Sequence, residues 1–281
     1  MTNDTNTVYL TELLRSDKRY RKAHDRLTGI LAKHAIPVKY IQDPNIRDIW
    51  CRDYMPVQID HDRFVQFRYD PSYLVGYEPR KTNPAEVSEA TQVNPTISTI
   101  NLDGGNIVNW GDRAIITDRI FSENPEFTNK VELVKEIEKL LEAEVIVIPQ
   151  IKSELSGHAD GMVRFVDRNT ILGNHRDQEY KYWSKGINRV LQAHGIRYID
   201  IPFGDYPIKE HPDHAIGCYV NYLEVGNLVV VPIFGYEPDK DEAVVQLFHE
   251  IFPDRIIESV DYNEVGLEGG LLNCSTWTVW E

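Results

Sequence analysis

The chain of 281 residues has few cysteines and no long apolar run, and both scarcities limit what it can be. Its three cysteines, Cys51, Cys218 and Cys274, are far apart, which argues against a disulfide framework and against a CxxC zinc site. No segment approaches the ~18 apolar residues of a membrane span, and the polar start lacks the basic and apolar blocks of a signal peptide. We therefore expect free thiols and a cytoplasmic location.

Basic residues are also scarce. The chain has 30 Lys and Arg against 44 Asp and Glu, a net charge of −14, which disfavours binding to nucleic acid or to anionic membranes. An acidic cleft would attract small cations, although the same charge could serve only solubility. A hydrophobic content of 42% is enough for a substantial core, and we predict one domain over residues 1–281.

A pattern of two strands, a helix and a third strand recurs four times, with a period of about 50 residues. The predicted strands and helices of the four copies are 50–59, 63–68, helix 85–91 and 96–100; 101–110, 114–117, helix 127–141 and 145–148; 158–166, 170–172, helix 179–194 and 197–201; and 218–225, 228–233, helix 239–252 and 255–260.

A fifth copy begins with a strand at 271–279, where the chain ends. The missing strand, helix and strand match the N-terminal pattern at 8–10, 18–32 and 38–41. We therefore predict an α/β propeller of five ββαβ modules with pseudo-fivefold symmetry, whose last module is closed by the N-terminal segment. Such closure leaves no first or last sheet edge unpaired.

Five polar positions fall near the start of the first strand of their own modules. They are Asp53, Asp103, His158, the segment Tyr219 to Asn221, and Cys274. Residues at one phase of a cyclic repeat converge on its axis, so we expect them to meet there. Chance placement of polar residues is the alternative, and the common phase makes it weaker than for any single motif.

Cys274 follows the pair Gly269-Gly270, where the backbone can turn or approach a ligand closely. A thiol acts as a nucleophile only as thiolate, so it needs a nearby cation, donor or base. We interpret Cys274 as the reactive atom. Buried cysteines in apolar strands are more often inert, and this is our interpretation of Cys51 and Cys218.

His158 can move protons near neutral pH, and a strand at this position would place Asp160 on the same face. Half of a metal site is the alternative, which is weaker because no matching histidine pair occurs elsewhere. The carboxylates of Asp53, Asp103 and Asp160 cannot share a buried site without a counter-charge. A guanidinium would satisfy two of them with its fork of N–H donors.

Two of these carboxylates could instead have purely structural roles. Asp53 could form a salt bridge with Arg52 or Arg47, and Asp103 could serve the turn before Gly104 and Gly105.

In this order the motifs resemble those of the agmatine deiminase and bacterial peptidylarginine deiminase family, which belongs to the guanidine-modifying (pentein) superfamily. The resemblance runs from about residue 50 to residue 277 and rests on the combination. The motifs are Trp50-x-Arg52-Asp53-x-x-Pro56; Asp103-Gly104-Gly105-Asn106; Gly157-His158-x-Asp160; Tyr219-Val220-Asn221-Tyr222 with Val230-Val231-Pro232-x-Phe234-Gly235; Phe252-Pro253-Asp254-Arg255; and Gly269-Gly270-x-x-Asn273-Cys274-x-Thr276.

The resemblance implies a five-module α/β propeller and hydrolysis of a guanidine, with agmatine as the leading substrate, to a ureido product and ammonia. Cys274 would attack the guanidinium carbon, His158 would move protons, and Asp103 would orient His158. Asp53 and Asp160 would hold the guanidinium, in a site to which Trp50 and Asn221 also contribute. It implies no metal and no organic cofactor, and a small cationic partner. A homo-oligomer is possible.

The sequence departs from the family pattern at several positions. Asp103 stands where Glu is common, although dimethylarginine hydrolases of the same superfamily have Asp there. Met55, Asn273 and Trp277 replace a usual Gly, His and Gln, and the chain lacks the Trp-containing opening segment of agmatine deiminases. These differences weaken the choice of substrate.

Three rival functions stay open at this point. An amidinotransferase would pass the same covalent intermediate to an amine, and a dimethylarginine hydrolase would take a methylated guanidine. Asp160 favours a guanidine with free N–H groups, because a second carboxylate gains little from a methylated nitrogen. A protein that binds guanidines without turnover is the third. The segment 69–77, rich in tyrosine, is either a lid or packed surface.

Overall fold

In the computed structural model, which describes residues 4–281, the strands pair into five sheets of three strands each. The sheets are β3 (Val57–Asp60), β4 (Arg63–Arg68) and β5 (Thr96–Asn101); β6 (Val108–Trp110), β7 (Arg113–Thr117) and β8 (Glu144–Ile148); β9 (Val163–Asp167), β10 (Thr170–Asn174) and β11 (Arg197–Ile201); β12 (Leu223–Val225), β13 (Leu228–Ile233) and β14 (Ile256–Asp261); and β15 (Trp277–Val279), β1 (Thr7–Thr11) and β2 (Val38–Ile41). In each sheet the middle strand is antiparallel to the first strand named here and parallel to the third.

Helices connect the second and third strands of every sheet. Those helices are α4 (Pro84–Ala90), α6 (Lys130–Leu141), α7 (Lys181–His194), α8 (Pro238–Ile251) and, between β1 and β2, α1 (Glu12–Ser16) and α2 (Arg21–Lys33). The other helices are α3 (Cys51–Tyr54), α5 (Arg119–Glu123), α9 (Asn263–Gly266) and the short 3-10 turns η1 (Ser72–Leu74), η2 (Glu78–Arg80), η3 (Gly104–Asn106) and η4 (Ala159–Gly161). On α7 the buried side chains Trp183, Ile187 and Leu191 recur every four residues, which explains why one face packs inward.

The fifth sheet joins the two ends of the described chain. Strand β1 lies between β15 and β2, with Thr7 opposite Val279 in the antiparallel pair and Val8 opposite Val38 in the parallel pair. This pairing confirms that the N-terminal segment completes the module begun by the last strand.

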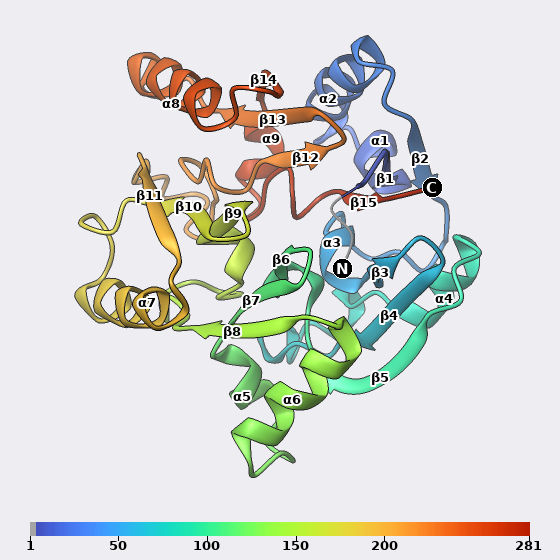
Figure 1. Ribbon diagram of the computed structural model, residues 1–281. Helices are drawn as coiled ribbons and strands as arrows, with labels where there is room; N and C mark the ends of the chain where they lie inside the picture. Colours follow the sequence, from blue (N-terminus) through green and yellow to red (C-terminus); the bar gives the residue numbers. More distant parts are fainter. Residues whose placement is uncertain (1–3) are drawn as a thin grey trace.

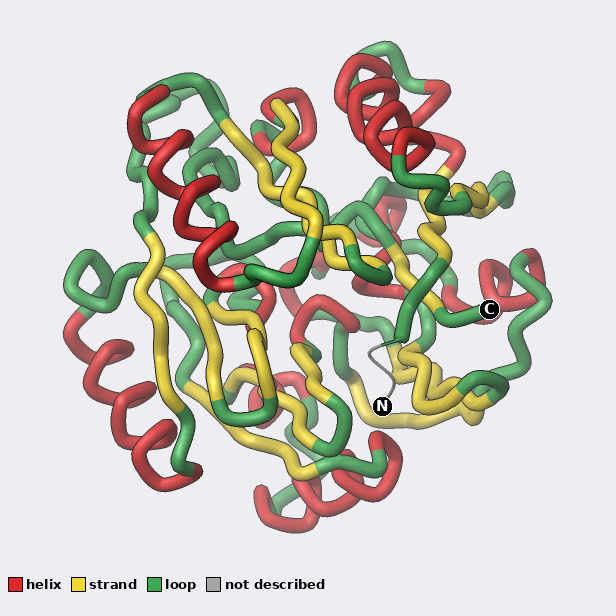
Figure 2. Tube along the Cα trace, turned by 45° about the horizontal axis from the view of Figure 1, so that its top comes forward, coloured by secondary structure: helices red, strands yellow, loops and turns green. Residues whose placement is uncertain are grey.

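The five sheets are distributed around the middle of the molecule in Figure 1, and helices α2, α6, α7 and α8 lie toward the outside. Figure 2 shows the same arrangement from a tilted view: the long helices lie at the periphery and the strands lie nearer the middle. Apolar side chains fill the space between these layers in four clusters, and Trp183, Tyr54 and Tyr222 are among the largest fully buried side chains. The arrangement leaves the starts of the modules facing one another.

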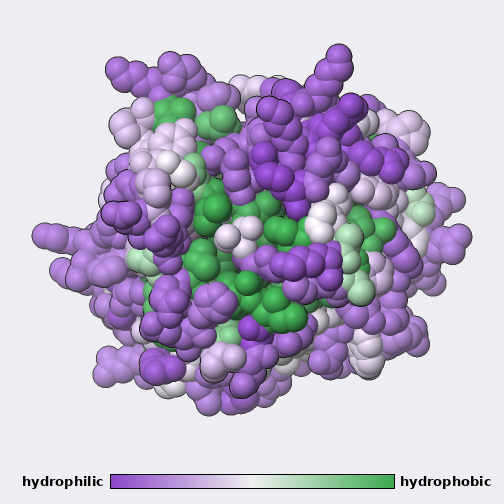
Figure 3. Space-filling view, turned by 90° about the horizontal axis from the view of Figure 1, so that it is seen from above, coloured by the Kyte–Doolittle hydropathy of each residue, from purple (hydrophilic) through white to green (hydrophobic). Residues whose placement is uncertain are grey.

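The side of the molecule seen from above Figure 1 has apolar residues grouped in the middle of a polar surround (Figure 3). Strand β14 contacts both α2 and α8, and its first residue, Ile256, is 41% exposed. Other exposed apolar residues include Tyr180 and Tyr182, whose rings lie 5.8 Å apart. Exposed apolar side chains in small numbers are normal for a globular protein.

The predicted start of each module's first strand was wrong. We expected strands from residues 50, 101, 158, 218 and 271, but the first strands begin at Val57, Val108, Val163, Leu223 and Trp277. Short helices or turns precede them, and His158 and Asp160 therefore do not share the face of a strand. The apolar residues that suggested longer strands are buried within these turns.

Asn106 shows why one of these strands is short. The register of β6 with β7 would place Asn106 opposite Thr117 if the ladder continued. Instead the side-chain oxygen of Asn106 accepts a hydrogen bond from the Thr117 amide at 3.0 Å. The side chain takes the place of the ladder, and the backbone is free to turn, with the Asn106 amide donating to the Asp103 carbonyl.

Trp277 ties the closing sheet to its neighbour. Its ring is 3% exposed, lies 5.0 Å from the Tyr9 ring and 6.1 Å from the Phe64 ring, and donates from Nε1 to the Pro56 carbonyl at 2.9 Å. We expect Trp277→Ala to lower the free energy of unfolding by about 3–5 kcal/mol, because it removes a buried aromatic and leaves a cavity. Urea denaturation measures this loss.

Trp280→Ala is the matched control, because Trp280 is only partly buried and its ring packs edge-on against His61. Its loss of stability should be smaller. Equal losses in the two variants would contradict the role given to Trp277 in joining the sheets.

Candidate active site

The candidate residues lie in the turns that precede the first strands, and these turns touch one another. Asp53 is in α3, Asp103 directly precedes η3, and His158 directly precedes η4, which contains Asp160. Contacts between α3 and η3 and between η3 and η4 bring them together. Asn221 and Cys274 lie in the turns before β12 and β15.

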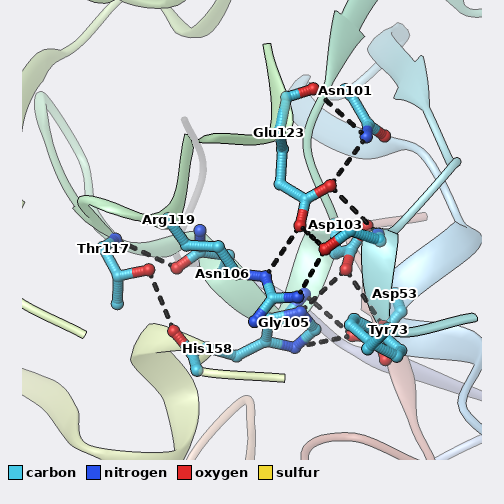
Figure 4. Close-up of polar contacts among 12 residues, drawn as sticks. Asp53, Tyr73, Asn101, Asp103, Gly105, Asn106, Thr117, Arg119, Glu123 and His158 are labelled. Carbon is cyan, nitrogen blue, oxygen red and sulfur yellow. Dashed lines mark hydrogen bonds and ion pairs between the residues drawn. The ribbon is translucent and has the colours of Figure 1, made fainter. Parts of the chain in front are cut away.

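His158 is surrounded by carboxylates. Its Nε2 is hydrogen-bonded to Asp103 Oδ2 at 2.8 Å, and its Nδ1 lies within ion-pair distance of Asp53 Oδ1, at 3.4 Å (Figure 4). Burial disfavours the imidazolium, but the charges of Asp53, Asp103 and Asp160 outweigh burial and raise the pKa of His158 to about 9. The imidazole is therefore protonated at neutral pH.

Tyr73 completes the surroundings of this histidine. Its hydroxyl donates to Asp103 Oδ2 at 3.0 Å, and its ring meets the His158 ring edge-on at 5.9 Å between centroids (Figure 4). Tyr73 lies within the segment 69–77. Ser72 bonds Glu123 through both its amide and its hydroxyl, while Val75 and Tyr77 are 74% and 57% exposed. The segment is thus anchored beside the site and exposed at its tip.

Cys274 lies against Asp160 and Asn221. Its thiol is 3.5 Å from Asp160 Oδ2, and the side-chain amide of Asn221 donates to Sγ at 3.1 Å. Asn221 Oδ1 accepts from the backbone amides of Asn273 at 3.0 Å and Cys274 at 3.2 Å, which fixes the turn that carries the thiol. Burial, followed by the charges of Asp160 and Asp53, raises the pKa of Cys274 well above its ordinary value.

The three buried carboxylates have one titratable cationic partner. In residues 4–281 no Lys or Arg side chain lies within ion-pair distance of Asp53, Asp103 or Asp160, and His158 pairs with the first two. Asp160 instead accepts a hydrogen bond from Asn273 Nδ2 at 2.7 Å. Burial raises the pKa of Asp53; the charge of His158 opposes this rise, and repulsion from Asp103 and Asp160 adds to it. The site therefore has a deficit of positive charge.

Glycine is required where α3 meets η3. A Cβ on Gly105 would lie 2.4 Å from Asp53 Oδ1 and 2.7 Å from His158 Nδ1, and a Cβ on Gly104 would lie 2.0 Å from the Arg52 carbonyl oxygen. The Gly105 amide also donates to Asp53 Oδ1 at 3.1 Å. The two glycines allow the close approach that brings Asp53 to His158.

Neither alternative salt bridge of Asp53 is formed. The Arg52 guanidinium donates instead to the Asn273 carbonyl and to Thr278 Oγ1, both at 3.3 Å, and so supports the turn that carries Cys274. Arg47 bonds Asn45. Trp50 packs its ring on Gly270, where an added Cβ would lie 2.6 Å from Cζ3, so it lies beside the glycine pair that precedes Cys274.

Sequence reasoning missed three groups of this site. Tyr73 was visible only as part of a tyrosine-rich segment, and Arg52 was considered only as a partner of Asp53. Asn273 was noted as a departure from a usual His, with no sign that its amide bonds Asp160. The sequence did offer one indication for Arg52 and Asn273, because Arg52 is adjacent to Asp53 and Asn273 is adjacent to Cys274.

Two other departures share one apolar cluster. Met55 and Trp277 are both 3% exposed and pack with Tyr9 and Tyr54 in the same part of the core. A large residue at each position fills this space, which accounts for both substitutions without involving the polar site.

The described residues contain no group of three or more His, Cys, Asp and Glu side chains that could hold a metal ion. None of the described helices is long and apolar enough to cross a membrane.

Solved structures share this fold. The agmatine deiminase of C. jejuni superposes with a TM-score of 0.79 at 16% identity, over 99% of this chain and 94% of its own. The agmatine deiminase of Enterococcus faecalis superposes with a TM-score of 0.76 at 18% identity, over 98% and 93%. The architecture is therefore the mixed α/β fold of these guanidine-processing enzymes.

Sequence comparison gives the family. The model of the Porphyromonas-type peptidyl-arginine deiminase family matches residues 4–279. A protein of Photobacterium profundum that carries the provisional name agmatine deiminase is 25% identical, over 84% of this chain and 77% of its own. The chain belongs to the Porphyromonas-type peptidyl-arginine deiminase family, and the family resemblance of its motifs is confirmed.

The charges around Cys274 have a consequence for its reactivity. We expect iodoacetamide to alkylate Cys274 slowly at neutral pH, because the raised pKa of the thiol leaves little thiolate. The Asp160→Asn variant removes a negative charge beside the thiol and should increase the alkylation rate by about tenfold or more. Mass spectrometry after timed quenching measures this rate. Burial raises the pKa of Cys51 and Cys218 as well, so they should stay unmodified.

Asp167→Asn, at an exposed position on β9, is the control and should leave the rate unchanged. An Asp160→Asn variant that reacted no faster than the wild type would show that Asp160 does not govern the thiol.

Proposed function

We propose that this protein is a deiminase that hydrolyses agmatine to N-carbamoylputrescine and ammonia through a covalent cysteine intermediate. One observation carries the proposal: a thiol, a protonated imidazole and three buried carboxylates converge without a Lys or Arg partner in the described chain. A guanidinium supplies the missing charge and places an electrophilic carbon beside the thiol.

Asp53 and Asp160 would hold the substrate guanidinium, each carboxylate accepting N–H groups of the planar fork. Binding a cation between them opposes the charges that raise the pKa of Cys274, so the substrate itself would favour formation of the thiolate. Asn221 would add a hydrogen bond to the sulfur. Trp50 would form a wall of the site, through its position beside Gly270.

His158 would handle the protons of both steps. The Cys274 thiolate attacks the guanidinium carbon, and the imidazolium gives its proton to the departing amino group, which leaves as ammonia. The neutral imidazole then takes a proton from water as the hydroxide attacks the S-alkylthiouronium carbon. Breaking of the C–S bond releases the ureido product, and the hydroxyl proton of the tetrahedral adduct goes to the sulfur and restores the thiol. This proton replaces the one that the Cys274 thiol released to solvent when the thiolate formed. Asp103 would keep the ring oriented through its 2.8 Å contact.

The choice of agmatine is supported by the relatives named for this activity, including the C. jejuni enzyme, which has also been solved with its substrate bound. Arginine derivatives and peptidyl-arginine are the competing substrate classes, and the family model carries the name of the latter. Asp160 favours an unmethylated guanidine, because both carboxylates then receive N–H donors.

We propose further that residues 1–281 form one domain with the pseudo-fivefold symmetry of a five-module propeller. The five sheets of equal topology and the pairing of β15 with β1 support this arrangement. The cytoplasmic location and association into a homo-oligomer stay predictions of the sequence.

Ammonia release from a substrate panel tests the proposed function. The panel contains agmatine, free arginine, methylated arginines, a blocked arginyl peptide and free guanidine. We expect release from agmatine, and a loss of at least about 1,000-fold in Cys274→Ala, because no other thiol can form the intermediate.

Mass spectrometry of the products, with glycine or ornithine present, separates hydrolysis from amidino transfer. Turnover that survived in Cys274→Ala would overturn the covalent mechanism. Tight binding with no ammonia from any compound would identify a binding protein instead.

The pH dependence of kcat at saturating agmatine reports on His158, because the bound guanidinium then favours the Cys274 thiolate. Neighbouring carboxylates raise the pKa of His158 to about 9, so kcat should fall as pH rises through the alkaline range and the proton needed by ammonia is lost. Asp103→Asn removes a charge and a charged hydrogen-bond acceptor that raise this pKa, so the fall should begin at lower pH. Initial rates from about pH 6 to about pH 10 measure both profiles.

Asp254→Asn, an exposed substitution, should leave the profile in place. An alkaline limb that did not move in Asp103→Asn would separate Asp103 from the titrating group.

A further inference from the structure

A pocket lies among the first strands of the modules, apart from the candidate active site. It consists of two adjoining cavities of about 70 and 80 Å³, which share Arg52, Asn109 and Thr278 in their walls. Each of β3, β6, β9, β12 and β15 contributes to the lining, and these strands surround the middle of the molecule in Figure 1. The candidate catalytic and guanidinium-binding side chains do not line it. We call this space the arginine pocket.

Two guanidinium groups line the larger cavity, those of Arg52 and Arg164. Arg52 donates to the Asn273 carbonyl and to Thr278 Oγ1, both at 3.3 Å. Arg164, on β9, donates to the Tyr222 carbonyl at 2.9 Å and lies over the Tyr222 ring, 4.5 Å from its centre. Within residues 4–281 neither guanidinium forms an ion pair with a carboxylate, so both keep an uncompensated positive charge.

The lining of the arginine pocket therefore has an excess of positive charge. Burial lowers the pKa of Arg52, and repulsion from Arg164 adds to this effect, while Asp160 is among the groups that oppose it. Glu224, a carboxylate in the lining, already pairs with Arg255 at 2.6 Å. The chain as a whole carries a net charge of −14, but salt screens exposed charges beyond about 10 Å.

The chemistry and size of the pocket select one kind of ligand. The N–H groups of a guanidinium match the oxygens of an oxyanion, and two guanidiniums balance two negative charges. The Thr278 hydroxyl is a further donor in the wall. Because a water molecule takes about 30 Å³ in the liquid, these cavities admit an ion of the size of sulfate and exclude a nucleotide or a peptide.

We propose that the arginine pocket binds one divalent oxyanion, of the class of sulfate and hydrogen phosphate, between Arg52 and Arg164. This site goes beyond the proposed deiminase function and does not depend on it. The backbone amide of Arg52 donates to the Cys274 carbonyl at 3.2 Å, so the bound anion contacts a residue that supports the turn carrying the thiol.

Isothermal titration calorimetry with sodium sulfate, at an ionic strength kept constant with sodium chloride, tests the proposal. We expect the wild type to bind one sulfate per chain. Arg164→Gln should weaken this binding by about 10- to 100-fold, the range for loss of a charged hydrogen bond. Inorganic phosphate should bind in the same site, and acetate should bind more weakly than sulfate, because it carries one charge and not two.

Thr278→Asp tests the pocket from the opposite direction and keeps the test usable if Arg164→Gln folds poorly. It places a carboxylate beside Arg52, so it should abolish sulfate binding although both arginines are retained. Arg168→Gln, exposed in the turn between β9 and β10, is the matched control and should bind sulfate as the wild type does.

Two results would overturn the anion site. One is an absence of saturable sulfate binding to the wild type, and the other is an equal weakening in Arg164→Gln and Arg168→Gln, which would show only general attraction to positive charge. Either result leaves the deiminase function standing, because ammonia release tests that function separately.

Discussion

The burial of Asp53, Asp103 and Asp160 around one histidine is the constraint on which the rest of this structure depends. Like charges this close cannot all persist away from water without a cation, and within ion-pair distance the described chain supplies only the His158 imidazolium. Folding energy from the surrounding core therefore holds together groups that repel one another. Strain of this kind is common where a protein has to receive a ligand of the opposite charge.

Side-chain amides, more than regular secondary structure, hold the central turns in place. Asn106 accepts hydrogen bonds from the amides of Thr117 and Ala159, and Asn221 does the same for Asn273 and Cys274. Each asparagine thus connects its own module to the next one. Contacts between modules thereby set the geometry of the candidate site, and the sheets support these contacts.

The order of the modules could be predicted because strand and helix periodicity repeats at a nearly fixed interval, and because the unfinished last copy matches the opening segment. The starts of the first strands could not be predicted. Turns such as the one at Asn106 contain apolar residues that look like strand residues, and side-chain hydrogen bonds that no local sequence pattern reveals stabilise these turns. The meeting of Asp53, Asp103, His158 and Cys274 followed from their common phase in the repeat. Tyr73 and Arg52 had no such phase, and only packing across modules shows their contacts.

Strand β1 pairs on one side with β2, close in sequence, and on the other with β15, about 270 positions away. Contacts of such long sequence separation form late in folding, because a large loop must close before they contribute. Cys274 lies only three residues before β15, so its turn gains its final neighbours when this pairing forms. We therefore expect the turn that carries Cys274 to be completed late in folding, when β15 joins β1.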